Sequence, residues 1–321
     1  MTISTWVVGS GGLLGSAIVR RLVSRPDTVL IDQRVRWGDV EQSLEDLRVG
    51  IRNWLSTEGA NRFELVWAAG AAVTSTTRTE LDAELDVLRW FIALVAESLA
   101  SCGLADATSM FLASSAGGVY AGARGAPFTE LTEARAASPY GETKLAMESL
   151  VTDFARTAGV RVLVGRISNL YGPGQRIEKP QGFVSQLCKS MLSRKPMAVY
   201  VSLDTMRDYI FADDAAETVV RCLARLADSE YAGNVLVKNI ASHVPTTLGH
   251  ILHEARLVFK RRPDVILAWS SMAAGQVRDL RIDSVTWPDL NDLPRRTLIV
   301  GLAETKASME LQMHRIGFGQ S

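Results

Sequence analysis

Tyr140 and Lys144 stand four residues apart in the stretch that runs from Ser138 to Lys144. If this stretch opens a helix, the spacing places both side chains on one helical face. An ammonium group stabilises a neighbouring phenolate, and a tyrosine tuned in this way can act as a general base near neutral pH. The same spacing also occurs by chance as a surface pair, so the interpretation depends on what surrounds it in the chain.

A glycine-rich stretch near the start of the chain has the spacing G-x-x-G-x-x-G, formed by Gly9, Gly12 and Gly15. It departs from G-x-G-x-x-G because residue 14 is leucine. Glycines between a strand and a helix let the backbone approach a pyrophosphate, whose charge meets free amides and the helix dipole. We expect dinucleotide contacts from Gly9, Gly11, Gly12, Leu13, Leu14 and Gly15. By itself, the stretch could also be a purely structural turn.

Asp32 ends the next predicted strand, seventeen positions after Gly15. A carboxylate at this place can accept hydrogen bonds from the hydroxyls of an adenosine ribose, which favours NAD. Arg34 and Arg36 follow directly and could neutralise a 2′-phosphate, so NADP remains the less favoured alternative. Asp32 could instead be a solvated turn residue.

The elements that must position these residues alternate between short apolar runs and amphipathic stretches. Strands are predicted at residues 6–8, 29–31, 65–67, 110–112 and 160–164. Helices are predicted at residues 14–23, 40–55, 81–99 and 144–155. Buried strands that alternate with helices indicate an α/β fold with a doubly wound parallel sheet of the Rossmann type.

The composition of the sequence changes after Arg166, where prolines divide the chain into shorter segments. We therefore expect a Rossmann domain over residues 1–169, to which residues from about 204 to 240 return. Residues 170–203 and 241–321 are expected to form a smaller C-terminal substrate-binding lobe. Such lobes vary more than the scaffold that carries them, and the sequence does not name the substrate.

Composition excludes several classes of protein. Thirty-five basic residues balance 35 acidic residues among 321, so no overall field attracts nucleic acid or an anionic membrane. Met1 to Val19 carries no charge, but glycines interrupt it, and we expect neither a membrane anchor nor a signal peptide. Three widely spaced cysteines predict reduced thiols, and we expect a cytoplasmic protein. His250, His253 and Glu254 have the wrong order for a zinc-binding helix, so no metal site is predicted.

Five motifs occur in a fixed order along residues 3 to about 220. They are Gly9-x-x-Gly12-x-x-Gly15, Ser114-Ser115 before Val119-Tyr120, Tyr140-x-x-x-Lys144, Arg166-x-x-Asn169-x-Tyr171-Gly172-Pro173-Gly174, and Arg207-Asp208-Tyr209-Ile210 followed by Asp213-Asp214. Together they resemble the extended short-chain dehydrogenase/reductases, specifically the NAD-dependent nucleotide-sugar epimerase and dehydratase family. The resemblance is specific as a set, although each motif alone is weak.

The resemblance implies a role for each matching residue. Tyr140 would take the proton from a sugar hydroxyl, and Lys144 would hold the nicotinamide ribose and tune Tyr140. Ser115, with Ser114 behind it, would supply a hydroxyl to the same sugar oxygen. Asn169 and Arg207 would face the diphosphate of a nucleoside-diphosphate sugar. Further cofactor contacts are implied for Ala68, Ala69 and Gly70 after the third strand.

Three positions depart from the family pattern. The catalytic hydroxyl falls on Ala116 when counted back from Val119-Tyr120, which makes Ser115 the nearest candidate. Gly117-Gly118 stands where sugar 4,6-dehydratases carry an Asp-Glu pair, so the usual acid and base of elimination are missing. The stretch 80–87 offers only Asp and Glu where the family has an asparagine near the cofactor.

These observations favour an NAD-dependent enzyme that epimerises a nucleoside-diphosphate sugar at C4 through a transient 4-keto sugar. The alternatives are a dehydratase or decarboxylase of the same family, an NADPH-dependent carbonyl reductase, and a regulator that senses nicotinamide without turnover. The resemblance also implies a homodimer formed through the helices at residues 81–99 and 144–155.

Overall fold

The computed structural model describes residues 1–73, 75–175, 177, 182–227, 235–269 and 277–315. Its α-helices are α1 (Leu13–Val23), α2 (Val40–Leu55), α3 (Arg78–Cys102), α4 (Ala116–Val119), α5 (Pro139–Ala158), α6 (Gly182–Ser193), α7 (Ala212–Ala227), α8 (Leu248–Phe259) and α9 (Leu298–Arg315). Its strands are β1 (Thr2–Val8), β2 (Thr28–Leu30), β3 (Ala60–Trp67), β4 (Thr108–Ser115), β5 (Arg161–Ile167), β6 (Asn169–Tyr171), β7 (Met197–Val199), β8 (Met206–Phe211), β9 (Val235–Ile240), β10 (Pro245–Thr247), β11 (Val265–Leu267) and β12 (Asp279–Leu280).

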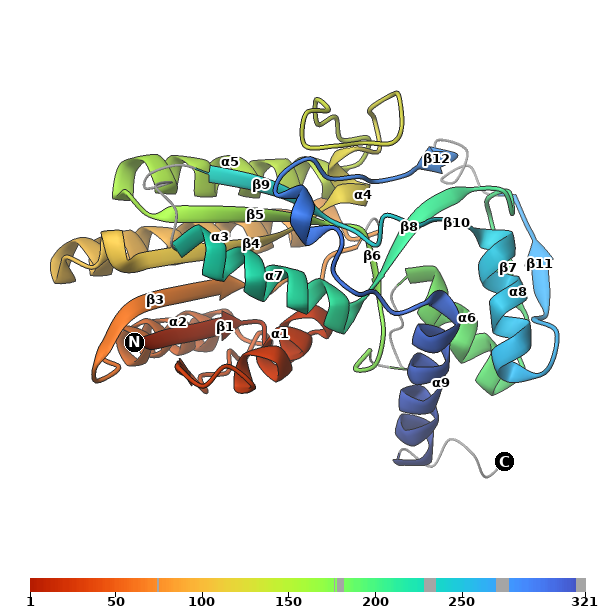
Figure 1. Ribbon diagram of the computed structural model, residues 1–321, viewed down its shortest axis with the longest axis horizontal. Helices are drawn as coiled ribbons and strands as arrows, with labels where there is room; N and C mark the ends of the chain where they lie inside the picture. The colour runs from red at the N-terminus through yellow and green to blue at the C-terminus, as the bar shows by residue number, and fades with distance from the viewer. Residues whose placement is uncertain (74, 176, 178–181, 228–234, 270–276, 316–321) are drawn as a thin grey trace.

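A six-stranded parallel sheet in the order β2-β1-β3-β4-β5-β9 forms the larger part of the molecule. Figure 1 shows this sheet and its helices at one end, with α6, α8 and α9 at the other. All five predicted strands and all four predicted helices are present, and β9 supplies the sixth strand. The predicted doubly wound sheet with a smaller C-terminal lobe is therefore confirmed.

The order of the first three strands differs from the dinucleotide-binding order 3-2-1-4-5-6. Here β2 is the edge strand, with three residues, and the third strand along the chain lies on the far side of β1. The sheet follows the related order 2-1-3-4-5, which has its switch point between β1 and β3.

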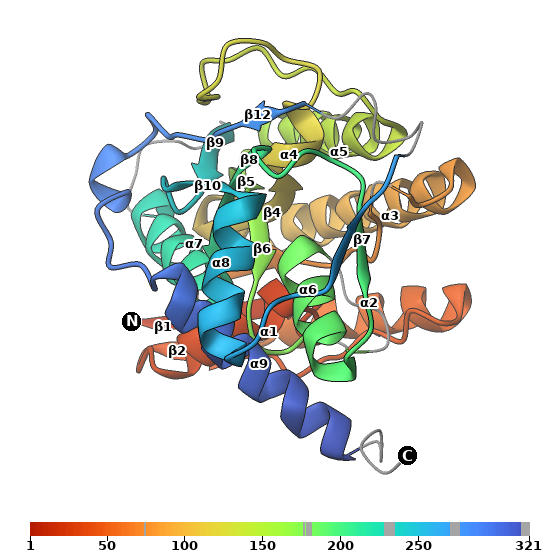
Figure 2. The same cartoon turned by 90° about the vertical axis from the view of Figure 1, so that its right-hand side faces the viewer.

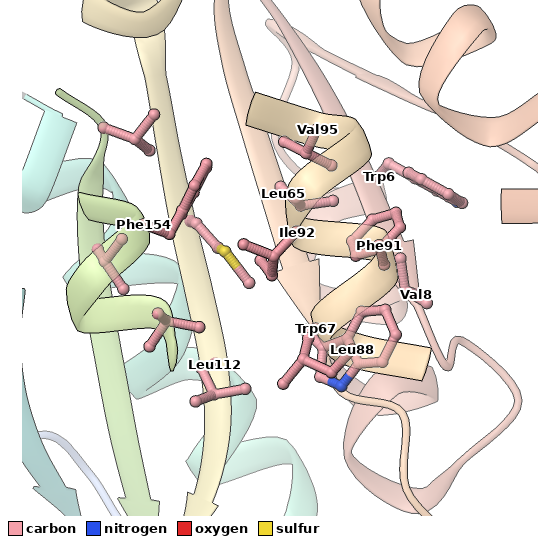
Figure 3. Close-up of a cluster of buried hydrophobic side chains, with 14 of the residues drawn as sticks. Trp6, Val8, Leu65, Trp67, Leu88, Phe91, Ile92, Val95, Leu112 and Phe154 are labelled. Carbon is pink, nitrogen blue, oxygen red and sulfur yellow. The ribbon is translucent and has the colours of Figure 1, made fainter. Parts of the chain in front are cut away.

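Two helical layers cover the sheet because alternate strand residues face opposite sides. Trp6 and Val8 of β1 pack in a cluster with residues of α2, α3 and α5, and Val7 packs with residues of α1 and α7. Figure 3 shows part of the first cluster, in which Trp6, Trp67 and Phe91 gather between the sheet and α3. Burial on both faces explains why the strands are nearly continuous apolar runs.

The smaller lobe has its own core, formed by apolar side chains of α6, α8, α9 and β7. Figure 2 shows α6, α8 and α9 side by side on this face. The strand β8 pairs with β6, β10 and β12 in a second, small sheet. In the described part of the segment expected to return to the Rossmann domain, α7 and β9 pack with the large sheet, whereas β8 belongs to this second sheet.

Local signals in the sequence set the ends of the helices around the site. Thr77 and Glu80 form a capping box at the start of α3, and Gly103 ends that helix at a φ of 66°. Ser138 caps α5, with Pro139 at its first position, and Gly159 ends it at a φ of 73°. In the described part of the chain, no helix is both long and apolar enough to cross a membrane.

Candidate functional site

The glycine-rich turn packs tightly against the loop after β3. A Cβ at Gly9 would lie 2.6 Å from the amide nitrogen of Ala69, and a Cβ at Gly15 would lie 2.1 Å from the carbonyl oxygen of Gly9. Gly9 also has a φ of 91°, which disfavours any other residue. The turn thus needs glycine at these two positions, and it places residues 9–15 beside Ala68.

The N-terminus of α1 fits a pyrophosphate. Its cap is Gly12, and among the described residues no side chain caps it and no acidic residue stands in its first turn. The free N–H groups and the positive end of the helix dipole therefore remain available to an anion. A Cβ at Gly174 would lie 3.6 Å from Ser16 Oγ, which places the loop after β6 over the start of this helix.

Ser115 and Tyr140 both lie close to Gly118. A Cβ at Gly118 would lie 3.0 Å from Tyr140 Cε1 and 3.4 Å from Ser115 Cβ. Ser115 Oγ accepts a hydrogen bond of 3.1 Å from the amide of Gly118, so this side chain caps the short helix α4. Its hydroxyl hydrogen remains available to a ligand, whereas Ala116 is fully buried.

Lys144 lies one helical turn after Tyr140, with only 7% of its surface exposed. Its Nζ is 5.6 Å from the centroid of the Tyr140 ring and 3.8 Å from Met147 Sδ. Among the described residues, Lys144 forms no ion pair, and a Cβ at Gly70 would lie 3.6 Å from its Nζ. The ammonium therefore sits between the general-base candidate and the loop after β3.

Ser114 does not join this group. Its hydroxyl donates a hydrogen bond of 2.5 Å to Glu148, and the side chain is buried against α5. Glu148 also receives Arg166 at 2.7 Å, and Arg166 donates to Tyr120 at 2.8 Å. The prediction that Ser114 contacts substrate finds no support in this geometry, because successive residues of a strand face opposite sides.

Asn169 and Arg207 come together on the paired strands β6 and β8. Asn169 donates 2.8 Å to the backbone oxygen of Asp208, and Arg207 donates to the backbone oxygens of Met206 and Arg278. Among the described residues no carboxylate pairs with Arg207, and burial lowers the pKa of its guanidinium. A half-buried guanidinium whose hydrogen bonds go to backbone carbonyls can bind an incoming phosphate.

Asp208 is a buried residue that connects several segments around it, and the sequence analysis did not identify this role. Its carboxylate accepts hydrogen bonds from Ser168 Oγ, Ser242 Oγ and the amide of Ser242. Burial raises the pKa of this carboxyl group, and the three donors oppose the shift. Asp208 thereby joins the ends of β5, β8 and β9 next to Arg207. The Arg207-Asp208-Tyr209-Ile210 motif is the feature of the sequence that could have indicated this role.

The two arginines after β2 that were predicted to neutralise a 2′-phosphate lie in different surroundings. Asp32 and Arg34 are both exposed and lie 4.0 Å apart. Arg36 is engaged with Asp46 of α2 at 2.6 Å, which lowers the pKa of that carboxyl group to about 2. Arg36 is thus held by α2. Asp32 lies two residues beyond the end of β2, and its contact with a ribose stays a prediction.

The sequence model of the NAD dependent epimerase/dehydratase family matches residues 5–237. The chain belongs to this family. The prediction of a member of this family of NAD-dependent enzymes is therefore confirmed, and the anion site at α1 fits such a cofactor.

Relatives within the family carry out different reactions. The dTDP-glucose 4,6-dehydratase of Mycobacterium tuberculosis is 36% identical over 31% of this chain and 29% of its own length. The UDP-glucuronic acid decarboxylase 2 of Arabidopsis thaliana is 26% identical over 82% of this chain and 62% of its own length. In these alignments the chain spans less than two thirds of each relative. The relatives establish the family and not the reaction.

Solved structures share the fold. The UDP-glucose 4-epimerase of Thermotoga maritima, solved with UDP-glucose, superimposes with a TM-score of 0.78 over 98% of this chain and 100% of the epimerase, at 21% identity. A dTDP-glucose 4,6-dehydratase from Bacillus anthracis in complex with NAD superimposes with a TM-score of 0.74 over 98% of each chain, at 17% identity. An epimerase and a dehydratase thus share this architecture.

Proposed function

We propose that the protein is an NAD-dependent nucleoside-diphosphate-sugar epimerase that acts at C4. One observation carries the proposal: Tyr140 and Ser115 flank Gly118, and Gly117-Gly118 occupies the place of the acid-base pair of the dehydratases. The site therefore has a base for a hydroxyl proton and lacks the usual carboxylates for elimination.

Three carboxylates on segments around this site are already engaged by donors. Glu148 is bound by Ser114 and Arg166, Asp208 by Ser168 and Ser242, and Glu142 by Arg78 at 2.8 Å. Because these three carboxylates already hold protein donors, they are not free to meet a leaving hydroxyl. We therefore assign the transfer of the hydroxyl proton to Tyr140.

In the proposed reaction, Tyr140 takes the proton of the C4 hydroxyl, and Ser115 donates a hydrogen bond to the same oxygen. When bound beside these residues, NAD would supply the hydride chemistry at C4. The 4-keto sugar turns in the site and presents its other face, and Tyr140 gives the proton back to the new hydroxyl. Lys144 holds the cofactor and stabilises the phenolate, while Asn169 and Arg207 bind the diphosphate and fix the nucleotide during the turn.

The test is a survey of UDP-, GDP- and dTDP-sugars by proton NMR in deuterated water with the purified protein and NAD. We expect inversion at C4 of at least one sugar, without deuterium at C5 or C6 and without net reduction of NAD. Deuterium at C5 or C6 would indicate a dehydratase, and loss of a sugar carboxylate a decarboxylase. Net oxidation of NADPH would indicate a reductase, and no turnover of any sugar would favour a regulator.

We further propose a homodimer through α3 and α5. These helices pack against each other along one face of the sheet. Arg78 of α3 forms an ion pair with Glu142 of α5, with 2.8 Å between Nη1 and Oε2. Sedimentation velocity should give twice the mass of the chain, and Arg89→Glu on the exposed face of α3 should lower the fraction of dimer. A purely monomeric protein would contradict this proposal.

A further inference from the structure

Glu84 of α3 has one engaged and one free carboxylate oxygen. Its Oε1 accepts hydrogen bonds of 2.8 Å and 3.0 Å from the amides of Ala71 and Ala72, so it holds the loop after β3. Its Oε2 is shielded from solvent, and no hydrogen-bond donor among the described residues meets it. A shielded anionic oxygen without a donor is costly, which suggests that a ligand supplies the donor.

The free oxygen and the ammonium of Lys144 both lie beside Gly70. A Cβ at Gly70 would lie 3.5 Å from Glu84 Oε2 and 3.6 Å from Lys144 Nζ. The two groups form no ion pair, although they carry opposite charges beside the same glycine. A carboxylate only accepts hydrogen bonds and an ammonium only donates them, so together they complement two neighbouring hydroxyls.

We propose that Glu84 is a binding residue for the nicotinamide ribose of the cofactor. Its Oε2 accepts a hydrogen bond from one ribose hydroxyl, while Lys144 donates to the other. This inference rests on the proposed function, because it requires NAD at the site. Glu84 lies in the stretch 80–87 that offers only acidic residues, and it gives the crevice a ribose acceptor at each end, with Asp32 at the adenosine end.

The test compares three ligands on Glu84→Gln. The amide keeps an oxygen for Ala71 and Ala72 and replaces Oε2 with a donor, which cannot accept from a hydroxyl. Isothermal titration with NAD and ADP-ribose, which carry the second ribose, should show affinity lowered roughly 10- to 100-fold. Affinity for ADP, which lacks that ribose, should stay unchanged.

The control variant is Asp86→Asn on the exposed side of the same helix, where Asp86 pairs with Arg89. It should leave the affinities for all three ligands at the parent values, and both variants should melt at the parent temperature. Equal losses for ADP, ADP-ribose and NAD in Glu84→Gln would overturn the inference in favour of a loop-holding role.

Unchanged NAD affinity in Glu84→Gln, with a parent protein that binds NAD, would overturn the inference and leave the proposed function intact. A parent protein that binds no NAD would overturn both. The titration uses no sugar, so a failed search for a sugar substrate does not affect its outcome.

Discussion

The two ends of the proposed cofactor site are built in different ways. At the end proposed for nicotinamide, Tyr140 and Ser115 lie against Gly118, and the buried Lys144 lies beside Gly70. At the adenosine end, the edge strand β2 has three residues, and Asp32 and Arg34 are exposed. One end positions side chains by packing, and the other presents them from the surface.

This difference predicts where substitutions matter most. A buried group loses its packing and its partners together when it is changed, whereas an exposed group exchanges one partner for water. We therefore expect large, specific effects at the nicotinamide end and smaller, more general effects at the adenosine end. The following variants are ordered by the expected size of the effect.

Tyr140→Phe should have the largest effect. It removes the phenol that takes the sugar proton and keeps the ring against Gly118, so turnover should fall roughly a thousandfold. NAD affinity should remain within a few-fold of the parent value, because the ring and Lys144 stay in place. Steady-state kinetics together with titration of NAD measure both quantities, and turnover near that of the parent would remove Tyr140 from the mechanism.

Gly118→Ala should come next. The added methyl would lie 3.0 Å from the Tyr140 ring and must displace it, so turnover should fall by about 10- to 100-fold. The matched control is Gly117→Ala, whose methyl would lie 3.9 Å from Leu280 and, among the described residues, near no other atom. The control should retain most of the activity with the same substrate. Similar losses in both variants would show that close packing of Tyr140 is not what Gly118 provides.

Asp32→Ala should weaken NAD and ADP alike, by about tenfold, because the adenosine ribose is common to both. It should also narrow the preference for NAD over NADP, since a carboxylate no longer repels the 2′-phosphate and Arg34 is left exposed. Titration with the three nucleotides provides the comparison. A loss of affinity confined to NAD would indicate that Asp32 contacts the nicotinamide ribose, and it would contradict the distinction between the two ends.

Asp46→Asn should have the smallest effect, confined to stability. Arg36 lowers the folded pKa of Asp46 from 3.8 to about 2, so the ion pair stabilises the fold above the unfolded value. This contribution is lost as the pH falls through the folded value. Parent and variant should therefore differ in melting temperature at pH 7, and the difference should close between pH 4 and pH 2. A constant difference across that range would contradict the assignment.

The large sheet, its helices and the cofactor turn could be predicted because their signals are local. Apolar runs, helical spacing and the position of the glycines each lie within one short segment, and they gave the parallel sheet and the place of Tyr140 and Lys144. The sequence also places Ser114 and Ser115 on opposite faces of β4, which alternation in a strand could have revealed.

The remaining features depend on pairings between distant segments. Glu84 accepts from the amides of Ala71 and Ala72 because α3 packs against the loop after β3. Asp46 of α2 pairs with Arg36 in the segment before that helix. The strand β8 pairs with strands far along the chain. No periodicity in the sequence encodes such contacts. Because β8 pairs with β6, β10 and β12, it belongs to the smaller sheet, while α7 and β9 pack with the larger one.

The measurement that tests the central claim most directly follows the hydrogen at C4. A nucleoside-diphosphate sugar found to be a substrate is labelled with deuterium at C4 and incubated in ordinary water with the enzyme and NAD. Our account predicts a C4 epimer that keeps the deuterium at C4, because the same hydride leaves and returns. An epimer with ordinary hydrogen at C4, or a product inverted at another carbon, would contradict it.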